Sequence, residues 1–311
     1  MNTAPTTEDR IWALLSHLSA LTLGMGILLP VIGWAEQRWK SKYASFQCLQ
    51  ALGYQSLGYT IWALFSAVAV IIFVIITLPT LNAAREPNDV GILVSDFVVF
   101  IFGLSGIYFL LPIIAAISCA LGKDFHYPIM GQRLARYLAY ESTEKSEEQT
   151  WLNEDHEIQW VAAMGHFSIL VILWGMLAPI TAWILYGNRN AFLKFQSIQT
   201  LVFQASVTIL YLGSVFIFLL GFIIISLFAL MGWTGDVRVD SSMGIVGIIF
   251  FGGSLLVLFI VVLFVPLLHI LGQWAGYRVL KGDDYRYPLI GRLVEGWISK
   301  QANSRTEEKP K

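Results

Sequence analysis

Long uninterrupted apolar runs constrain this chain of 311 residues more than any other feature. A helix needs about 20 mostly apolar residues to cross the hydrocarbon core of a bilayer. Only 13% of the residues are charged, which is too few to cover a water-facing surface. The chain is therefore predicted to be an integral membrane protein. The apolar runs of sufficient length cover residues 11–35, 51–78, 91–121, 160–186, 201–233 and 243–271.

The character of these runs favours helices over the strands of a membrane barrel. Lipid offers no hydrogen bonds to the backbone, so only helices and closed barrels cross it. Barrel strands alternate polar and apolar residues, whereas residues 68–76 and 247–264 are apolar at almost every position. The predicted fold class is an all-α integral membrane protein with about six transmembrane helices.

The sequence contains an internal duplication. At a shift of 149 positions His17 meets His166, and residues 46–55 align with residues 195–204 without a gap. At a shift of 160 positions residues 122–131 match residues 282–291. The aligned residues include Trp, His, Pro and Gln, which shared hydrophobicity alone would not align. Two three-helix repeats are therefore predicted.

Composition sets the predicted boundaries of the repeats. Residues 1–140 form the first membrane repeat and residues 158–298 form the second. Between them, residues 141–157 form an acidic linker that is too polar to cross lipid. Residues 299–311 form a polar tail without a fixed structure.

Three crossings in each repeat would turn the second repeat upside down relative to the first, as in inverted-repeat transporters. The alternative is that the first apolar run of each repeat does not cross, because Gly26 and Pro30, or Gly175 and Pro179, break it. Inversion is the favoured prediction. Lys and Arg are balanced between the two sides, so the membrane orientation stays open.

Glutamines and histidines recur at matching positions of the two repeats and form a candidate polar helix face. One interpretation is a polar lining for a pathway or a partner site, and the other is hydrogen bonding between helices, which we favour. A proton relay would need acidic partners within the spans, and Asp96 alone offers one. The residues of this face are Gln47, Gln50, Gln55, Gln196, Gln199, Gln204, His17 and His166.

A second group consists of aromatic and proline residues at the ends of the runs. Trp is enriched at the headgroup level and Pro ends or kinks a helix. These residues are therefore predicted to anchor the chain at the membrane surface, where nearby basic residues would contact lipid headgroups or a partner. The anchors are Trp34, Trp183, Tyr127, Pro128, Tyr287 and Pro288.

No catalytic, metal-binding or nucleotide-binding motif occurs in the sequence. Gly-x-Ser-x-Gly, His-Glu-x-x-His and Walker patterns are absent, and Cys48 and Cys119 do not have the spacing of a metal-binding pair. The net charge of −1 with scattered basic residues argues against a nucleic-acid partner. A non-enzymatic protein without a cofactor is therefore expected.

The run from His17 through Phe46-Gln-x-x-Gln-Ala to Gln55, followed by Tyr127-Pro128, resembles an uncharacterised bacterial membrane-domain family. That family is grouped with the twenty-kilodalton component of the translocon of the inner chloroplast envelope. In the second repeat Thr200 replaces the Ala. The resemblance implies a helical membrane fold whose glutamine-bearing helices border a protein-conducting or partner-binding groove.

The leading functional prediction is a multi-pass interaction module or a component of a translocation assembly in a bacterial cytoplasmic membrane. Its expected partners are the lipid bilayer and either other membrane proteins or further copies of the chain. The main alternative is a small-solute transporter or channel, and a third is a membrane enzyme acting on lipid. A hydrated cavity bordered by the glutamines and histidines would favour transport, and a dry packed seam would favour the interaction module.

Overall fold

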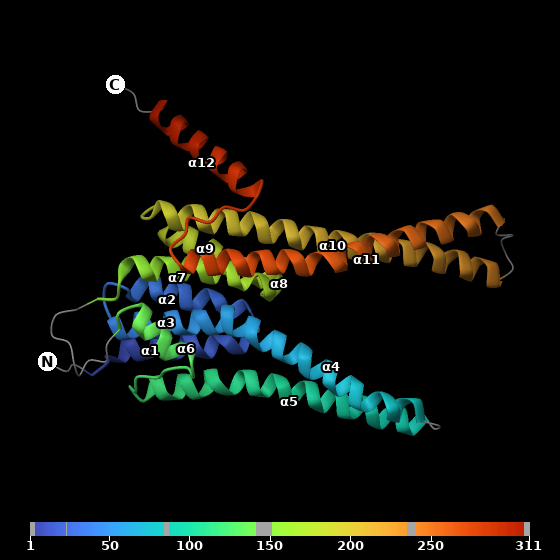
Figure 1. Ribbon diagram of the computed structural model, residues 1–311, viewed down its shortest axis with the longest axis horizontal. Coiled ribbons are helices and arrows are strands. Elements are labelled where there is room, and N and C mark those ends of the chain that lie inside the picture. Colours follow the sequence, from blue (N-terminus) through green and yellow to red (C-terminus); the bar gives the residue numbers. More distant parts are fainter. Residues whose placement is uncertain (1–3, 23, 84–86, 141–150, 235–240, 308–311) are drawn as a thin grey trace.

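The computed structural model describes residues 4–307 apart from residues 23, 84–86, 141–150 and 235–240 (Figure 1). The described residues are predominantly helical and contain no β-strand. In this part of the chain four helices are long and apolar enough to cross a membrane, which makes the protein an all-α membrane protein. These spans are Lys42–Thr80, Val90–Ala120, Ala191–Met231 and Gly244–Leu280.

Each repeat contains one long hairpin of two such helices. In the first repeat α3 (Lys42–Gly53) continues through a π-helical turn (Tyr54–Gly58) into α4 (Tyr59–Ala83), which is followed by α5 (Pro87–Ala120). In the second repeat the hairpin consists of α10 (Ala191–Thr234) and α11 (Ser241–Leu280).

The first apolar run of each repeat forms a short hairpin instead of a span. In the first repeat α1 (Thr7–Leu18) ends in 3₁₀ turns, and α2 (Leu28–Gln37) returns alongside it. In the second repeat α7 (Glu154–Phe167) leads through a 3₁₀ turn and the short α8 (Ile172–Gly175) to α9 (Leu177–Tyr186).

Close backbone approach at a glycine explains why these runs break. A Cβ on Gly26 would lie 1.8 Å from the carbonyl oxygen of Ser19, and a Cβ on Gly175 would lie 2.1 Å from that of Ser168. Only a residue without a side chain allows the chain to fold back so tightly. The glycine-broken alternative from the sequence therefore matches the structure.

Two predictions about topology need correction. The described residues hold four candidate spans where six were predicted. Each repeat holds two candidate spans, and the two long hairpins extend in the same direction (Figure 1), so the repeats are parallel in this structure and the predicted inversion is not confirmed. All six apolar runs are long enough to cross lipid. In each repeat, however, the first run bends at a glycine and forms a short hairpin instead of a span.

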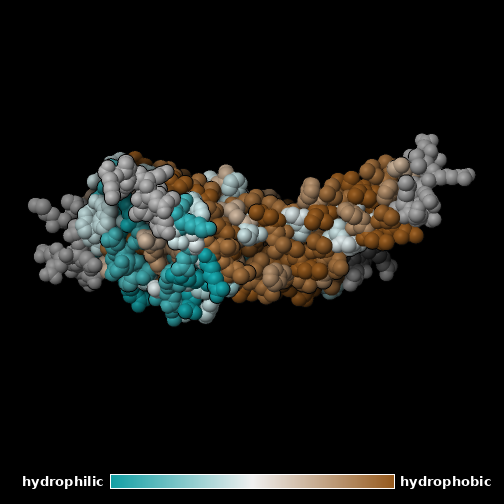
Figure 2. All heavy atoms as spheres, turned by 90° about the horizontal axis from the view of Figure 1, so that it is seen from above, coloured by the Kyte–Doolittle hydropathy of each residue, from teal (hydrophilic) through white to brown (hydrophobic). Residues whose placement is uncertain are grey.

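The surface divides along the length of the molecule. Figure 2 shows a hydrophilic surface at one end and a long hydrophobic body at the other. Large apolar side chains such as Phe102, Ile76 and Ile249 are exposed on the long hairpins, as expected for a surface in contact with lipid. The short hairpins pack around the polar end, where one cluster of buried side chains extends across both repeats.

Each repeat closes with an extended segment and a helix. The closing segments, residues 122–129 and 282–289, lead into α6 (Met130–Tyr137) and α12 (Ile290–Glu307). The predicted polar tail therefore begins inside a helix. Of the predicted linker, residues 141–150 lie outside the described residues, and its last residues already belong to α7.

Candidate functional site

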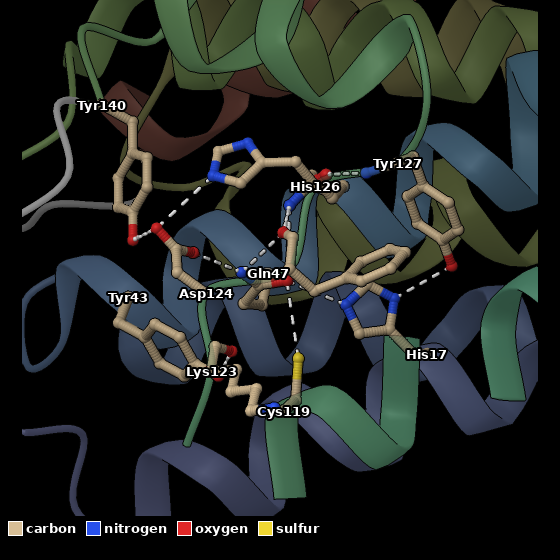
Figure 3. Close-up of polar contacts among 11 residues, drawn as sticks. His17, Tyr43, Gln47, Cys119, Lys123, Asp124, His126, Tyr127 and Tyr140 are labelled. Atoms are coloured by element: carbon tan, nitrogen blue, oxygen red, sulfur yellow. Dashed lines mark hydrogen bonds and ion pairs between the residues drawn. The ribbon is translucent and has the colours of Figure 1, made fainter. Parts of the chain in front are cut away.

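His17 is the centre of a buried hydrogen-bond network in the first repeat (Figure 3). Its Nε2 lies 3.0 Å from Oε1 of Gln47, and its Nδ1 lies 3.0 Å from the hydroxyl of Tyr127. An amide oxygen only accepts, so Nε2 carries the proton and the Tyr127 hydroxyl donates to Nδ1. Burial lowers the pKa of His17 to about 4, with the Gln47 bond opposing it in part, so the ring is neutral near pH 7.

The two glutamines next to His17 hold the closing segment. Gln47 Nε2 donates to Oδ1 of Asp124 at 2.8 Å and to the carbonyl oxygen of Phe125 at 3.0 Å. Gln50 pairs with the main chain as a neighbouring strand would. Its Nε2 donates to Phe125 O at 2.8 Å, and its Oε1 accepts from Tyr127 N at 3.0 Å. The main-chain groups of the neighbouring helices are already paired within those helices. The glutamine side chains therefore supply hydrogen bonds to the main chain of the extended segment.

The second repeat reproduces these contacts. His166 Nε2 donates to Gln196 Oε1 at 3.1 Å, and its Nδ1 accepts from the Tyr287 hydroxyl at 2.9 Å. Gln196 Nε2 donates to Asp284 Oδ1 at 2.9 Å. Gln199 pairs with the main chain of its closing segment at 2.7 and 3.3 Å. Burial lowers the pKa of His166 to about 4 as well.

The third glutamine of each repeat holds the break in the short hairpin. Gln55 Nε2 donates to the carbonyl oxygen of Ser16 at 3.1 Å and to the hydroxyl of Ser19 at 3.0 Å. Gln204 Nε2 likewise donates to the carbonyl oxygen of Gly165 at 2.8 Å. The end of a helix leaves carbonyl groups without helical partners, and these amides bind them.

These contacts favour hydrogen bonding between elements over a pathway lining. All eight side chains of the predicted polar face are buried, and they are bonded to one another or to the main chain of the same repeat. Within the described residues, Oε1 of Gln55 and Oε1 of Gln204 have no hydrogen-bond partner. The two residues help to line two small cavities, of about 70 and 230 Å³ respectively. We call the hydrogen-bond network of each repeat its polar lock. In the first repeat it consists of His17, Gln47, Gln50, Asp124 and Tyr127.

Sequence reasoning missed the acidic members of the polar locks. Asp124 accepts from Gln47 and also from the Tyr140 hydroxyl at 3.0 Å, and Asp284 is its counterpart. The sequence could have revealed them, because Asp124 and Asp284 occupy the same position in the two matched closing segments. Among the described residues no three His, Cys, Asp or Glu side chains are grouped so that they could hold a metal ion.

The predicted membrane anchors lie elsewhere than expected. Trp34 is fully buried against Tyr186 of the other repeat, and Trp183 is half-buried near Trp297. Tyr127 and its counterpart are buried in the polar locks, where their hydroxyls bind the histidines. Protein therefore surrounds most of these rings where a lipid headgroup was predicted. Of the predicted anchors, Pro128 and Pro288 are exposed.

A buried ion pair joins the two repeats at the polar end. Arg38 at the end of α2 lies 2.8 Å from Glu157 in α7, and Ser45 donates to the same carboxylate at 3.2 Å. The guanidinium also lies over the rings of Trp34 and Tyr186. Burial raises the pKa of Glu157 to about 7, and Arg38 counteracts that rise.

Residues of both repeats line an apolar groove of about 710 Å³. Its walls come from the long hairpin of the first repeat, including Tyr54 and Tyr108, and from α6. Trp160 and Leu280 of the second repeat complete it. The glutamines and histidines of the polar locks do not line this groove.

The two cysteines, Cys48 and Cys119, are buried and form no disulfide.

Two parallel membrane hairpins in tandem, each closed by a buried polar lock, define a multi-pass helical membrane protein with a duplicated domain. Comparison with known families identifies the domain. The model of the MamF/MmsF family, described as a magnetosome magnetite crystal formation protein family, matches residues 8–134 and 157–294. The chain belongs to this family and carries its domain twice. No curated protein and no solved structure matches the chain.

This match overturns the resemblance to the chloroplast translocon component. The residues that carried the resemblance, including Gln47, Gln50 and Tyr127, hold the closing segment against the helices. They reflect the packing of a broken helix and an extended segment, and they carry no information about protein translocation.

Proposed function

We propose that this chain is a non-enzymatic membrane protein that takes part in the formation of magnetite crystals. The observation that carries the proposal is the match of the crystal-formation family to both repeats. The long hairpins would hold the protein in the membrane of the magnetosome, where the sequence alone had predicted a bacterial cytoplasmic membrane. The polar end would then act at the membrane surface.

The polar locks support a structural role for the polar residues over a catalytic one. His17 and His166 are neutral, buried and hydrogen-bonded through both ring nitrogens. A catalytic base needs access to a substrate proton, and these rings have none. The same packing argues against the transporter alternative, which requires a hydrated route past these side chains.

The network of buried contacts at the polar end is the second support. Each polar lock joins the helix that carries its histidine (α1 or α7), the helix that carries its glutamines (α3 or α10) and the closing segment of its repeat, and the Arg38–Glu157 pair joins the repeats. An assembly that organises a crystal-bearing membrane needs a surface of defined shape. We propose that the locks maintain that surface.

Deletion of the coding sequence in a magnetite-forming cell tests the proposal. We expect crystals of altered size or shape by electron microscopy, and restoration by the intact chain. The double variant Gln47→Leu with Gln196→Leu, which breaks both locks, should restore poorly. The matched control Phe102→Leu, on the exposed apolar surface, should restore fully. Unchanged crystals after deletion would rule out the proposed role.

A further inference from the structure

The contact between the two repeats has two parts: α2 packs against its counterpart α9, and α3 of the first repeat packs against α7 of the second. The second part uses two different faces, and each of these faces occurs a second time at the ends of the tandem. The helix face of the second repeat is the side of α7 that carries Trp160 and Met164. The groove face of the first repeat is the surface around Arg38, Ser45 and Gly53. Trp160 joins the two faces, because its Nε1 donates to the carbonyl oxygen of Leu49 at 3.0 Å.

The duplicate helix face, on α1, is apolar and exposed. Ile11 stands where the second repeat has Trp160, and it is 51% exposed while Trp160 is 5% exposed. Leu15 stands where the second repeat has Met164, and it is 38% exposed while Met164 is fully buried. The residues that become buried between the repeats thus have apolar counterparts that remain exposed among the described residues.

The duplicate groove face, in the second repeat, is also uncovered. Val202 stands where the first repeat has the buried Gly53, and it is 37% exposed. Trp297 stands where the first repeat has Tyr137, whose hydroxyl lies 2.8 Å from Gln159 of α7. Trp297 is 42% exposed on α12, which projects from the rest of the molecule (Figure 1).

The two uncovered faces are complementary in side-chain size. Between the repeats, a Cβ on Gly53 would lie 2.5 Å from the Trp160 ring, so the large ring requires the glycine. At the uncovered faces the large residue is replaced by the smaller Ile11, and the glycine is replaced by the larger Val202. The two changes compensate each other, as in a volume-conserving exchange.

The uncovered faces are complementary in charge as well. Between the repeats, Glu157 forms an ion pair with Arg38 and accepts a hydrogen bond from Ser45. The counterpart of Glu157 is Glu8, which is exposed. On the second groove face Gly187 replaces the arginine, and Lys194 replaces the serine. The positive charge thus stands at the position of Ser45, whose hydroxyl donates to Glu157 between the repeats.

We propose that copies of this chain associate head to tail in the membrane, with the groove face of one chain's second repeat on the helix face of the next chain's first repeat. The new contact repeats the part of the inter-repeat contact in which α3 packs against α7. Because the repeats are parallel (Figure 1), the same displacement keeps every copy spanning the bilayer in the same direction. Such a contact joins two different faces, so it builds rings or open rows. This inference goes beyond the proposed function and does not depend on it.

Thiol cross-linking in native membranes tests the predicted contact. Cells co-express one variant with Ile11→Cys and another with Val202→Cys, and a short bifunctional thiol reagent is added. We expect a cross-linked dimer from the mixture and little from either variant alone, since a symmetric dimer would link like positions. The exposed lipid-facing pair Ile75→Cys with Ile249→Cys measures random collision, and the unchanged chain measures reaction at its buried cysteines.

Charge reversal gives a second readout that does not use cysteines. Glu8→Lys and Lys194→Glu each place like charges opposite each other at the new contact, so each should shift the detergent-purified protein toward monomer. The double variant restores an opposite pair and should recover the larger species. Light scattering during size-exclusion chromatography reports the mass.

Three results would overturn the proposal. The first is a chain that is monomeric in both native membranes and mild detergent while the cysteine mixture links no more than the random pair. The second is equal cross-linking by the single variants, which would show a symmetric contact. The third is protection of Trp297 by lipid vesicles without any cross-link, which would assign the uncovered faces to the bilayer surface.

Discussion

The hydroxyl of Tyr127 and Nδ1 of His17 are joined by a hydrogen bond of 3.0 Å that connects the closing segment of the first repeat to its first helix. Tyr287 and His166 repeat this bond at 2.9 Å. Because both partners are buried, the bond joins segments that are far apart in the sequence without competition from water. The stability of the polar end is therefore expected to depend on it.

Tyr127→Phe removes the donor and leaves Nδ1 of His17 buried without a partner. We expect a loss of about 1–3 kcal/mol in unfolding free energy, the usual effect of an unsatisfied buried acceptor. The thermal midpoint in detergent measures it, and Tyr287→Phe should behave in the same way. Tyr211→Phe, at an exposed position on α10, is the matched control. Equal midpoints for Tyr127→Phe and the control would contradict the role of the bond.

The two buried histidines predict a pH dependence of stability. Their pKa falls from 6.5 to about 4 on folding because of burial. The unfolded chain therefore binds more protons between those values, so the unfolding free energy decreases as the pH falls from 6.5 toward 4. The loss reaches about 3 kcal/mol for each histidine at the lower end and is absent above pH 6.5.

Thermal midpoints between pH 7.5 and 4.5 measure this effect. The double variant His17→Gln with His166→Gln should be less stable at pH 7.5 but should show a flatter pH profile. Burial raises the pKa of Glu157 to about 7, so its protonation makes the fold more stable as the pH falls, opposite to the effect of the histidines. Glu157 is present in both the unchanged chain and the double variant, so it does not account for a difference between them. The same slope in both proteins would rule out the histidines as its source.

Gly26→Ala should prevent the short hairpin from closing. The added Cβ would lie 1.8 Å from a backbone oxygen, which cannot move without opening the turn. We expect loss of monodisperse protein after detergent extraction, and the same from Gly175→Ala. Gly103→Ala, on α5 with no atom within 4 Å of the added Cβ, should be neutral or slightly stabilising. Normal yield and midpoint for Gly26→Ala would mean that the run is not broken there.

A double-mutant cycle at Arg38 and Glu157 measures the bond between the repeats. Breaking a buried ion pair by removing one partner typically costs about 3–5 kcal/mol, because the other charge stays buried. Arg38→Met with Glu157→Gln should cost clearly less than the sum of the single variants. Lys40→Met, which breaks an exposed pair with Glu36, should cost at most about 1 kcal/mol. Additive losses at the buried pair would show that the two charges do not interact.

The parallel arrangement of the repeats predicts the membrane sidedness of two turns. Lys40 follows the short hairpin of the first repeat, and Arg189 follows that of the second; both are exposed at the polar end. Lys40→Cys and Arg189→Cys should both react with an impermeant thiol reagent from the same side of sealed vesicles. Reaction from opposite sides would restore the inverted arrangement.

Several features followed from the sequence alone. Long apolar runs predict membrane helices because transfer into lipid depends on the summed hydropathy of a segment and needs no tertiary partner. The tandem repeat was visible because His, Gln and Pro recur at one constant spacing. The glutamines and histidines of the polar locks were also recognisable as candidates, because they recur at matching positions of the two repeats.

Other features depended on contacts between distant segments. The first apolar run turns back because Gly26 meets the backbone at Ser19 and Gln55 binds the exposed carbonyl of Ser16. Trp34 resembles a membrane anchor in isolation, but the second repeat covers it. Hydropathy describes each segment against a uniform solvent, whereas the tertiary structure decides whether lipid, water or another part of the chain surrounds it.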